Sequence, residues 1–251
     1  MKVKSIIAVL LLVIAGLQTV WAQKIVLTMA DDSKVKYNIT QVKDITFEEA
    51  EEPDEHEWVD LGLPSGTLWA TCNVGANKPE DYGGYFAWGE TETKGSYEWS
   101  NYKWCNGTNN TLTKYCYSSS DGMVDNKTEL EPDDDVATQK WGNDWQMPSL
   151  TQYNELINSE NTTASWTTFN GVDGRLIVSN LNGNSIFLPA AGVMNGSGLS
   201  MNGWEGCYWT RTLDMNTSQE GDALFFLITG KFKTGCDRRC YGQSVRPVRK
   251  Q

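Results

Sequence analysis

The chain has 251 residues and a formal net charge of −11, from 21 lysine and arginine residues against 32 aspartate and glutamate residues. A surface that binds nucleic acid needs clustered Lys and Arg to displace counterions from phosphates, so this balance argues against a nucleic-acid partner. The length suits one large domain with an accessory segment, at the usual roughly 100 to 200 residues per domain.

The first 22 residues have the pattern of a signal peptide. Lys2 and Lys4 precede an apolar run from Ile6 to Leu17, and Ala22 supplies the small residue of a cleavage site. The run is shorter than the roughly 18 to 20 residues that span a bilayer, and no second run of that length follows. We therefore expect an exported chain, periplasmic, at the cell surface or secreted, that does not span a membrane.

Residues 23–47 predict a small β-hairpin segment. Apolar and polar side chains alternate on both sides of a polar turn at residues 30–33, with the apolar positions at Ile25, Leu27, Met29, Val35, Tyr37 and Ile39. Residues 48–57 are a run of carboxylates around Pro53, which is typical of a solvated acidic linker. A cation-binding acidic tail is the alternative interpretation of this run.

Residues 58–249 have the pattern of one β-rich domain with two helices. The first predicted helix, Pro132–Trp141, carries three aspartates in its first turn, where the helix dipole favours negative charge. The second covers residues 149–159, with Ser149 as N-cap and an apolar face at Leu150, Tyr153, Leu156 and Ile157. Strands are predicted at 174–179, 185–189, 206–211, 222–229 and 244–248, the last four spaced as in one antiparallel sheet. The expected fold class is α+β.

Six sequence blocks follow one another at residues 58–76, 82–90, 141–148, 188–192, 208–210 and 244–249. They include WVDLGLPSGTLWAT, YGGYFAWGE, WGNDWQMP, LPAAG, YWT and SVRPVR. Together they resemble the Fibrobacter succinogenes major paralogous domain, a family of exported proteins in Bacteroidetes-type bacteria. The resemblance covers residues 58–249. It implies a C-type-lectin-like fold, similar also to formylglycine-generating enzymes, with a twisted antiparallel sheet, two helices and long loops.

The blocks are expected to be mostly structural. Large aromatic side chains are buried more often than displayed, so we expect the core to contain Trp69, Trp88, Trp141, Trp145 and Trp209. Arg246 is expected to pair with a buried carboxylate or with loop carbonyls. Four tryptophans outside the blocks are candidates either for the core or for a sugar-stacking surface: Trp99, Trp104, Trp166 and Trp204.

No cofactor is predicted. The six cysteines allow 15 full disulfide pairings in an exported chain, so the sequence selects none. No pair has Cys-x2-Cys spacing and the single histidine, His56, lies in the acidic run, which argues against a structural zinc site. A calcium site is an open alternative because many carboxylates lie around residues 121–135, but calcium needs six to eight oxygens that converge in space. The triplet Glu131-Pro132-Asp133, similar to a calcium motif of sugar-binding C-type lectins, is interpreted as a helix start.

The sequence predicts no enzyme. A histidine-dependent triad would need His56 inside the domain, and neither Gly-x-Ser-x-Gly nor His-Glu-x-x-His occurs. Carboxylate-pair chemistry remains open, because two acids meet in space rather than in sequence. Formylglycine-generating relatives use a cysteine pair near the C-terminal end, but the Cys236-Asp-Arg-Arg-Cys240 spacing departs from that pattern. A turn disulfide or two free thiols is expected there.

Residues 204–241 are the predicted recognition face. The predicted ligand contacts are Trp204, Tyr208, Arg211, Asp214, Asp237, Arg238, Arg239 and Tyr241. Relatives usually carry Tyr, Asn or Ser at several of these positions, so the resemblance implies either a face diversified by retroelements or ordinary variation of surface loops. We expect an exported, non-enzymatic module that recognises a glycan or protein at the cell surface. The alternative is a structural or adhesion subunit that docks through residues 24–47.

Overall fold

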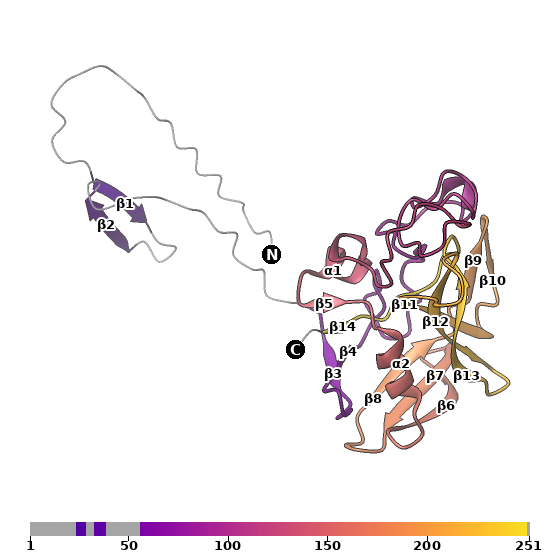
Figure 1. The fold of residues 1–251 in the computed structure, drawn as a ribbon. Coiled ribbons are helices and arrows are strands. Elements are labelled where there is room, and N and C mark those ends of the chain that lie inside the picture. Colours follow the sequence, from indigo (N-terminus) through magenta and orange to yellow (C-terminus); the bar gives the residue numbers. More distant parts are fainter. Residues whose placement is uncertain (1–23, 29–32, 39–55, 250–251) are drawn as a thin grey trace. The chain divides into compact units, whose positions relative to one another are not determined.

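The computed structural model describes residues 24–28, 33–38 and 56–249, and it divides into a unit before Pro53 and a larger unit from Pro53 onward (Figure 1). The predicted signal peptide and all but the last two residues of the predicted linker lie outside the described residues. In the first unit, β1 (Lys24–Thr28) pairs antiparallel with β2 (Lys34–Asn38), at the two segments where the alternation predicted a hairpin.

The second unit closes on itself through a four-stranded sheet in the order β3-β4-β14-β5. Its strands are β3 (Trp58–Asp60), β4 (Leu68–Ala70), β5 (Trp145–Gln146) and β14 (Val248–Arg249). Because β14 pairs with both β4 and β5, the last described residues are joined to the beginning and the middle of the unit.

Two three-stranded antiparallel sheets and one short hairpin complete the strands of the described residues. The first sheet contains β6 (Thr162–Phe169), β7 (Val172–Ser179) and β8 (Ser185–Pro189). The hairpin is β9 (Val193–Asn195) with β10 (Gly198–Ser200). The second sheet contains β11 (Glu205–Leu213), β12 (Glu220–Leu227) and β13 (Phe232–Arg238). The prediction that the last four strands share one sheet is therefore wrong, because β8, the β11–β12 pair and β14 belong to three different sheets.

The two predicted helices are present, and both begin at a side-chain cap. The first starts later than predicted: residues 132–134 form a 3₁₀ turn (η3), and α1 (Val136–Trp141) follows with Asp135 as N-cap. A second 3₁₀ turn, η2, covers Trp99–Asn101. Helix α2 (Leu150–Ile157) begins at a capping box between Ser149 and Gln152. It packs its buried Tyr153 and Leu156 against β11, β12 and β13. The described chain is thus mostly antiparallel sheet with two α-helices, an α+β architecture.

The core contains the block tryptophans, as predicted for four of the five. Trp69, Trp88, Trp145 and Trp209 are completely buried, whereas Trp141 is half-buried. Arg246 is also completely buried and follows the carbonyl alternative: its guanidinium donates to the carbonyls of Ala70 and Thr71 and to the Asn73 amide oxygen. Within the part of the chain that the structure describes, no helix is long and apolar enough to cross a membrane.

Candidate functional site on the β11–β12–β13 sheet

The predicted recognition residues lie on or directly beside the strands of one sheet, but they are spread between its two ends. Glu205 lies opposite Leu227 at one end of the register, and Glu220 lies opposite Arg238 at the other. Seven residue steps at about 3.3 Å each separate the two ends by about 23 Å. The eight predicted contacts therefore do not form one continuous patch, and each end needs its own description.

Trp204 lies at the first end and is exposed. Its side chain is 59% accessible, and its carbonyl accepts a 3.0 Å hydrogen bond from the amide of Ile228, which is also exposed. The Trp204 amide in turn donates to the carbonyl of exposed Met201. Three exposed apolar residues are therefore joined through backbone hydrogen bonds at this end of the sheet. The other outlying tryptophans, at 99, 104 and 166, are half-buried and pack against core clusters.

Tyr208 and Arg239, two of the predicted contacts, are completely buried. The Tyr208 hydroxyl donates to the Pro189 carbonyl at 2.7 Å. The Arg239 guanidinium donates to the Tyr102 hydroxyl and to the carbonyls of Lys114, Tyr115 and Ser218, all within 3.0 Å. Neither side chain is accessible to a ligand in this structure, so both belong to the scaffold. The interpretation of Arg238 and Arg239 as a joint binding contact is corrected accordingly.

Arg238 and Tyr241 lie at the surface near the second end of the sheet. Arg238 is exposed and donates to the hydroxyl of half-buried Tyr241 at 3.3 Å. Arg211 is half-buried and forms a 2.9 Å ion pair with Glu129. Asp237 accepts a 2.9 Å hydrogen bond from the Gln243 amide, and burial raises the pKa of the Asp237 carboxyl to about 6. Of this group, Arg238 has the most accessible charge.

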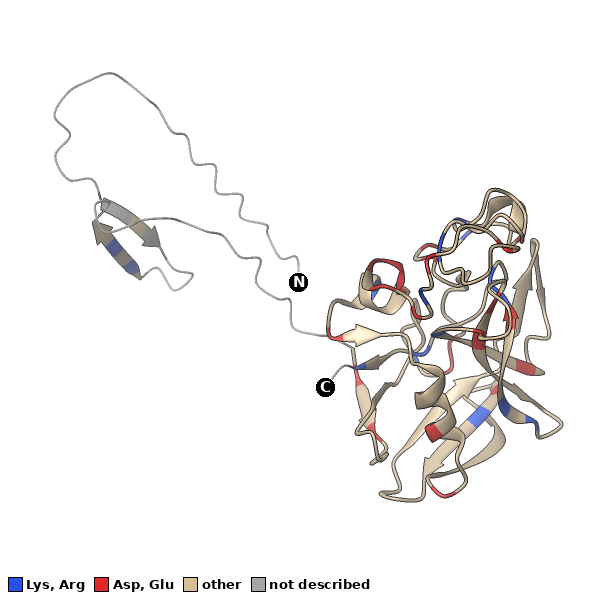
Figure 2. Ribbon diagram, viewed as in Figure 1, with Lys and Arg blue, Asp and Glu red and all other residues tan. Residues whose placement is uncertain are grey.

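A cavity of about 430 Å³ lies along β12 and β13, with Glu205 of the first end and Cys236 of β13 in its wall. Cavities that hold small ligands have volumes of about 300 to 1,000 Å³. It is lined by Glu205, Phe225, Phe226, Leu227, Lys231, Lys233, Gly235 and Cys236. Burial raises the pKa of Glu205, and the charge of Lys231 opposes that shift. The cavity thus offers an aromatic wall with both a carboxyl and ammonium groups. Figure 2 shows basic positions, in blue, along the β12–β13 hairpin.

Sequence reasoning did not identify Glu205, Lys231 or Lys233 as site residues. For Lys233 the reason is that β13 was not predicted as a strand, whereas Glu205 and Lys231 lie just outside the strands predicted at 206–211 and 222–229. The available signal was the alternation of Phe232, Thr234 and Cys236 with the lysine and glycine between them.

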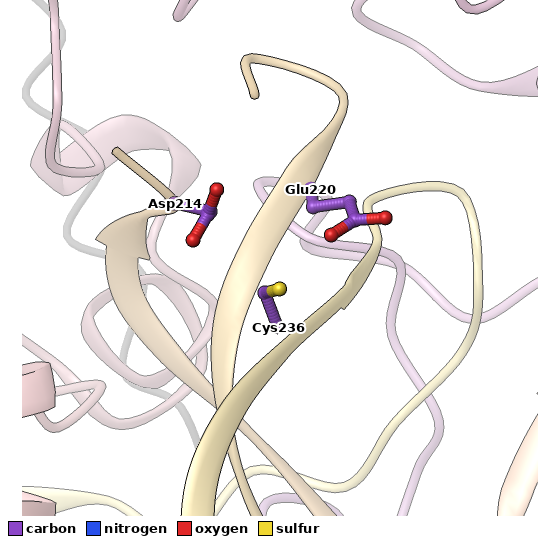
Figure 3. Close-up of side chains that lie close together, drawn as sticks. All are labelled: Asp214, Glu220 and Cys236. Carbon is purple, nitrogen blue, oxygen red and sulfur yellow. The ribbon is translucent and has the colours of Figure 1, made fainter. Parts of the chain in front are cut away.

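Four acidic groups form a cluster at the second end of the sheet, which we call the acid–thiol cluster: Asp214, Glu220, Asp222 and Cys236. One donor atom from each of Asp214, Glu220 and Cys236 lies within 4.8 Å of the other two (Figure 3). Asp222 is only 6% exposed, and burial together with the charge of Asp214 raises its pKa to about 7. Burial and a hydrogen bond to Glu220 raise the pKa of the Cys236 thiol to about 12. Without a bound cation, Cys236 is a neutral thiol at neutral pH.

Of this cluster, the sequence pointed to Asp214 as a ligand contact and to Cys236 as part of a turn disulfide or as a free thiol, but not to Glu220 or Asp222. All six cysteines are free in the structure, which agrees with the free-thiol alternative for Cys236 and Cys240. At Glu131-Pro132-Asp133, where the sequence predicted a helix start, the structure has the 3₁₀ turn η3, and the α-helix itself begins after Asp135.

His56 packs against the domain rather than extending away in a linker. Its ring stacks on Trp141 with centroids 3.7 Å apart and planes 12° from parallel. Cavities of about 340 Å³ and 470 Å³ both include the His56–Trp141 pair in their walls. The premise that no histidine lies in the main domain is therefore wrong.

No protein-family model, curated protein or solved structure matches this chain.

Proposed function

We propose that residues 58–249 form a C-type-lectin-like domain of the Fibrobacter succinogenes major paralogous type, and that the chain is an exported, non-enzymatic module that binds a glycan at the cell surface. The observation that carries this proposal is the cavity of about 430 Å³ along β12 and β13, with exposed Trp204 next to its lining residue Glu205. The six sequence blocks and the α+β architecture support the fold assignment.

The chemistry of this surface suits a sugar. A pyranose has an apolar face that stacks on an exposed indole, and hydroxyl groups that pair with charged hydrogen-bonding side chains. Trp204 offers the indole, while Glu205 and Lys231 offer an acceptor and a donor beside the aromatic wall. Arg238 and Tyr241, about 23 Å along the sheet, would contact only a longer ligand.

A glycan array probed with the full chain tests the proposal. We expect retention on a subset of glycans that is lost in Trp204→Ala and reduced in Lys231→Ala. The matched control is Trp58→Ala, which removes another exposed tryptophan, 44% accessible, from a different sheet. Equal binding by the Trp204→Ala and Trp58→Ala variants would refute the assignment of the face. Binding to envelope proteins but to no glycan would change the ligand class to protein.

The β1–β2 hairpin favours the alternative, a structural or adhesion subunit. An isolated two-stranded hairpin is at best marginally stable in water, and Val26, Val35 and Tyr37 are all at least 40% exposed. Such a hairpin gains stability when its apolar side chains pack against a partner. Capture of envelope proteins by the full chain that is lost in Val35→Asp/Tyr37→Asp, with glycan binding absent throughout, would favour this alternative.

A further inference from the structure

Arg175 reaches from β7 to the hairpin between β12 and β13. Its guanidinium donates to the carbonyls of Leu227 and Lys231, at 3.1 and 3.2 Å. Both carbonyls also accept from backbone amides of the turn, because the Leu227 amide donates to Lys231 and the Gly230 amide donates to Leu227, each at 3.0 Å. Leu227 and Lys231 line the cavity of about 430 Å³. The Arg175 charge is therefore held one hydrogen bond behind the cavity wall.

This guanidinium is buried without a counterion. Arg175 is only 5% exposed, and it forms no ion pair with the described residues. Its Nε atom is buried and has no hydrogen-bond partner among them. The guanidinium carbon lies 5.9 and 5.1 Å from the ring centroids of Phe226 and Phe232. Burial lowers the pKa of Arg175, the direction expected of a cation without a neighbouring carboxylate. An anion in the adjacent cavity would supply the missing opposite charge.

Two lysines add their charges from the cavity itself. Lys231 and Lys233 line it, are exposed, and form no ion pair with any residue in 56–249. By contrast, all five lysines between residues 94 and 140 are in ion pairs. Glu205 is the one carboxyl in the lining, and burial raises its pKa, which disfavours its charged form. Two ammonium groups in the wall and one guanidinium behind it thus oppose a single carboxyl.

We propose that this cavity selects an anionic sugar, one whose pyranose ring carries a carboxylate or sulfate group. The inference rests on the proposed glycan function and names the class of glycan. Lys231 and Lys233 contact the anionic group, and the Arg175 charge acts on it from behind the wall. Trp204 stacks on the apolar face of the ring. The Ile228 amide donates to the Trp204 carbonyl at 3.0 Å, so the indole is joined to the same hairpin that carries the cations.

The charge of the whole chain does not cancel this local arrangement. A net charge of −11 repels anions at long range. Exposed charges more than about 8 to 10 Å apart are largely screened at physiological salt, so a bound ligand responds mainly to the groups around the cavity. The buried guanidinium of Arg175 is screened less than the exposed lysines. Binding to the anionic sugar should therefore weaken as salt is raised.

Direct binding of the full chain to a pair of probes tests the inference. The first probe is an oligosaccharide of hexuronic acid, and the second is the same oligosaccharide with its carboxyl groups converted to methyl esters. The esters keep the sugar rings but remove the charge. At low salt the acid form should bind at least about 10-fold more tightly than the ester, and this preference should shrink towards about 1 M salt. A third probe with sulfate in place of the carboxylate identifies which anionic group is preferred.

Three variants assign the preference to these residues. Lys231→Ala/Lys233→Ala should abolish the preference for the acid form over the ester. Arg175→Met should reduce that preference in a folded chain, because both carbonyls that Arg175 contacts keep their backbone amide donors. Loss of packing alone would weaken both probes equally and leave their ratio unchanged. Lys78→Ala is the matched control, since Lys78 is another exposed lysine without an ion pair to the described residues, and the ratio should not change.

The outcomes separate this inference from the proposed glycan function. Equal affinity for the acid and ester forms would overturn the inference and leave glycan recognition in place. So would retention of neutral glycans with no binding to either anionic probe. A preference that persists in a Lys231→Ala/Lys233→Ala variant, shown to be folded by circular dichroism, would overturn the assignment to this cavity. Absence of binding to every glycan would overturn the proposed function together with the inference.

Discussion

Arg238 and Arg239 are adjacent in the sequence, yet we predict that replacing them with alanine has very different effects on stability. Arg239 is completely buried, and its guanidinium makes four hydrogen bonds, one to a tyrosine hydroxyl and three to carbonyls. It also lies 4.8 Å from the centroid of the Trp88 ring. Hydrogen bonds to charged groups contribute about 1.5 kcal/mol each at the lower end of their range, so the loss of four in Arg239→Ala should cost about 6 kcal/mol.

Such a loss is a large part of the about 5 to 15 kcal/mol that stabilises a typical domain. At about 2 to 4 °C per kcal/mol for a domain of this size, the midpoint of thermal unfolding should fall by roughly 12 to 24 °C. Arg238→Ala changes an exposed side chain and should stay within about 0.5 kcal/mol of the wild type.

Urea unfolding followed by tryptophan fluorescence measures both variants on the same scale. Arg239→Lys gives an intermediate case, because the charge is kept while most of the fork of donors is lost. A loss of less than about 1.5 kcal/mol in Arg239→Ala would refute the reasoning, since it would mean that the four hydrogen bonds contribute no more than one does. Because Arg239 belongs to the buried scaffold, a loss of ligand binding in an Arg238→Ala/Arg239→Ala double variant would report impaired folding rather than a lost ligand contact.

Three further predictions concern the packing of two glycines and the environment of two carboxyls. A Cβ on Gly206 would lie 2.1 Å from the Phe226 ring, whereas one on Gly235 meets nothing closer than 3.4 Å, so Gly206→Ala should cost about 2 kcal/mol more than Gly235→Ala in urea unfolding. The Asp135 carboxylate accepts hydrogen bonds from three buried backbone amides. In Asp135→Asn, the side-chain NH₂ group would face one of these amide donors, so the substitution should cost about 2 kcal/mol in the same assay. Burial pushes the pKa of Asp125 upward, but three backbone hydrogen bonds and a lysine bring it below the usual value. Its stabilising effect is therefore full above the unfolded pKa of about 3.9 and is lost as the pH falls through the folded value. The stability gap between wild type and Asp125→Asn should accordingly stay constant from pH 6 to about pH 4 and narrow only below the unfolded pKa of about 3.9, and a gap that widens on acidification would contradict this sign.

Local signals in the sequence predicted the elements that depend on local physics. Ser149 and Gln152 cap α2 because their side chains satisfy amides within one helical turn. The run at 185–189 coincides with β8, and four of the five block tryptophans are completely buried. Sheet membership was not predictable in the same way. β14 is two residues long and exists because β4 and β5, more than 100 residues earlier in the chain, supply its partners.

Strand β13 shows why the candidate site was only partly predicted. Its sequence contains Lys233, Gly235 and Asp237, residues that are uncommon in strands, and it forms because β12 offers a continuous register from residue 220 to 226. Once the strand is known, alternation requires neighbouring side chains at its end to point in opposite directions. That rule separates exposed Arg238 from the buried arginine next to it, whereas the sequence alone suggested one cationic cluster.

One face of strand β12 changes from acidic to apolar side chains along its length. On one face it carries Glu220 and Asp222 and then Leu224 and Phe226, which are completely buried in the core. The same face is therefore acidic at one end and apolar in the middle, and the buried Leu224 with its register partner Tyr208 lies between the acid–thiol cluster and Trp204. Effects of substitutions more than about 10 Å apart without shared partners usually add, so the changes in unfolding free energy of Asp222→Asn and Trp204→Ala should add. Coupling between these two substitutions in urea unfolding would mean that a change at one end of the sheet moves its middle.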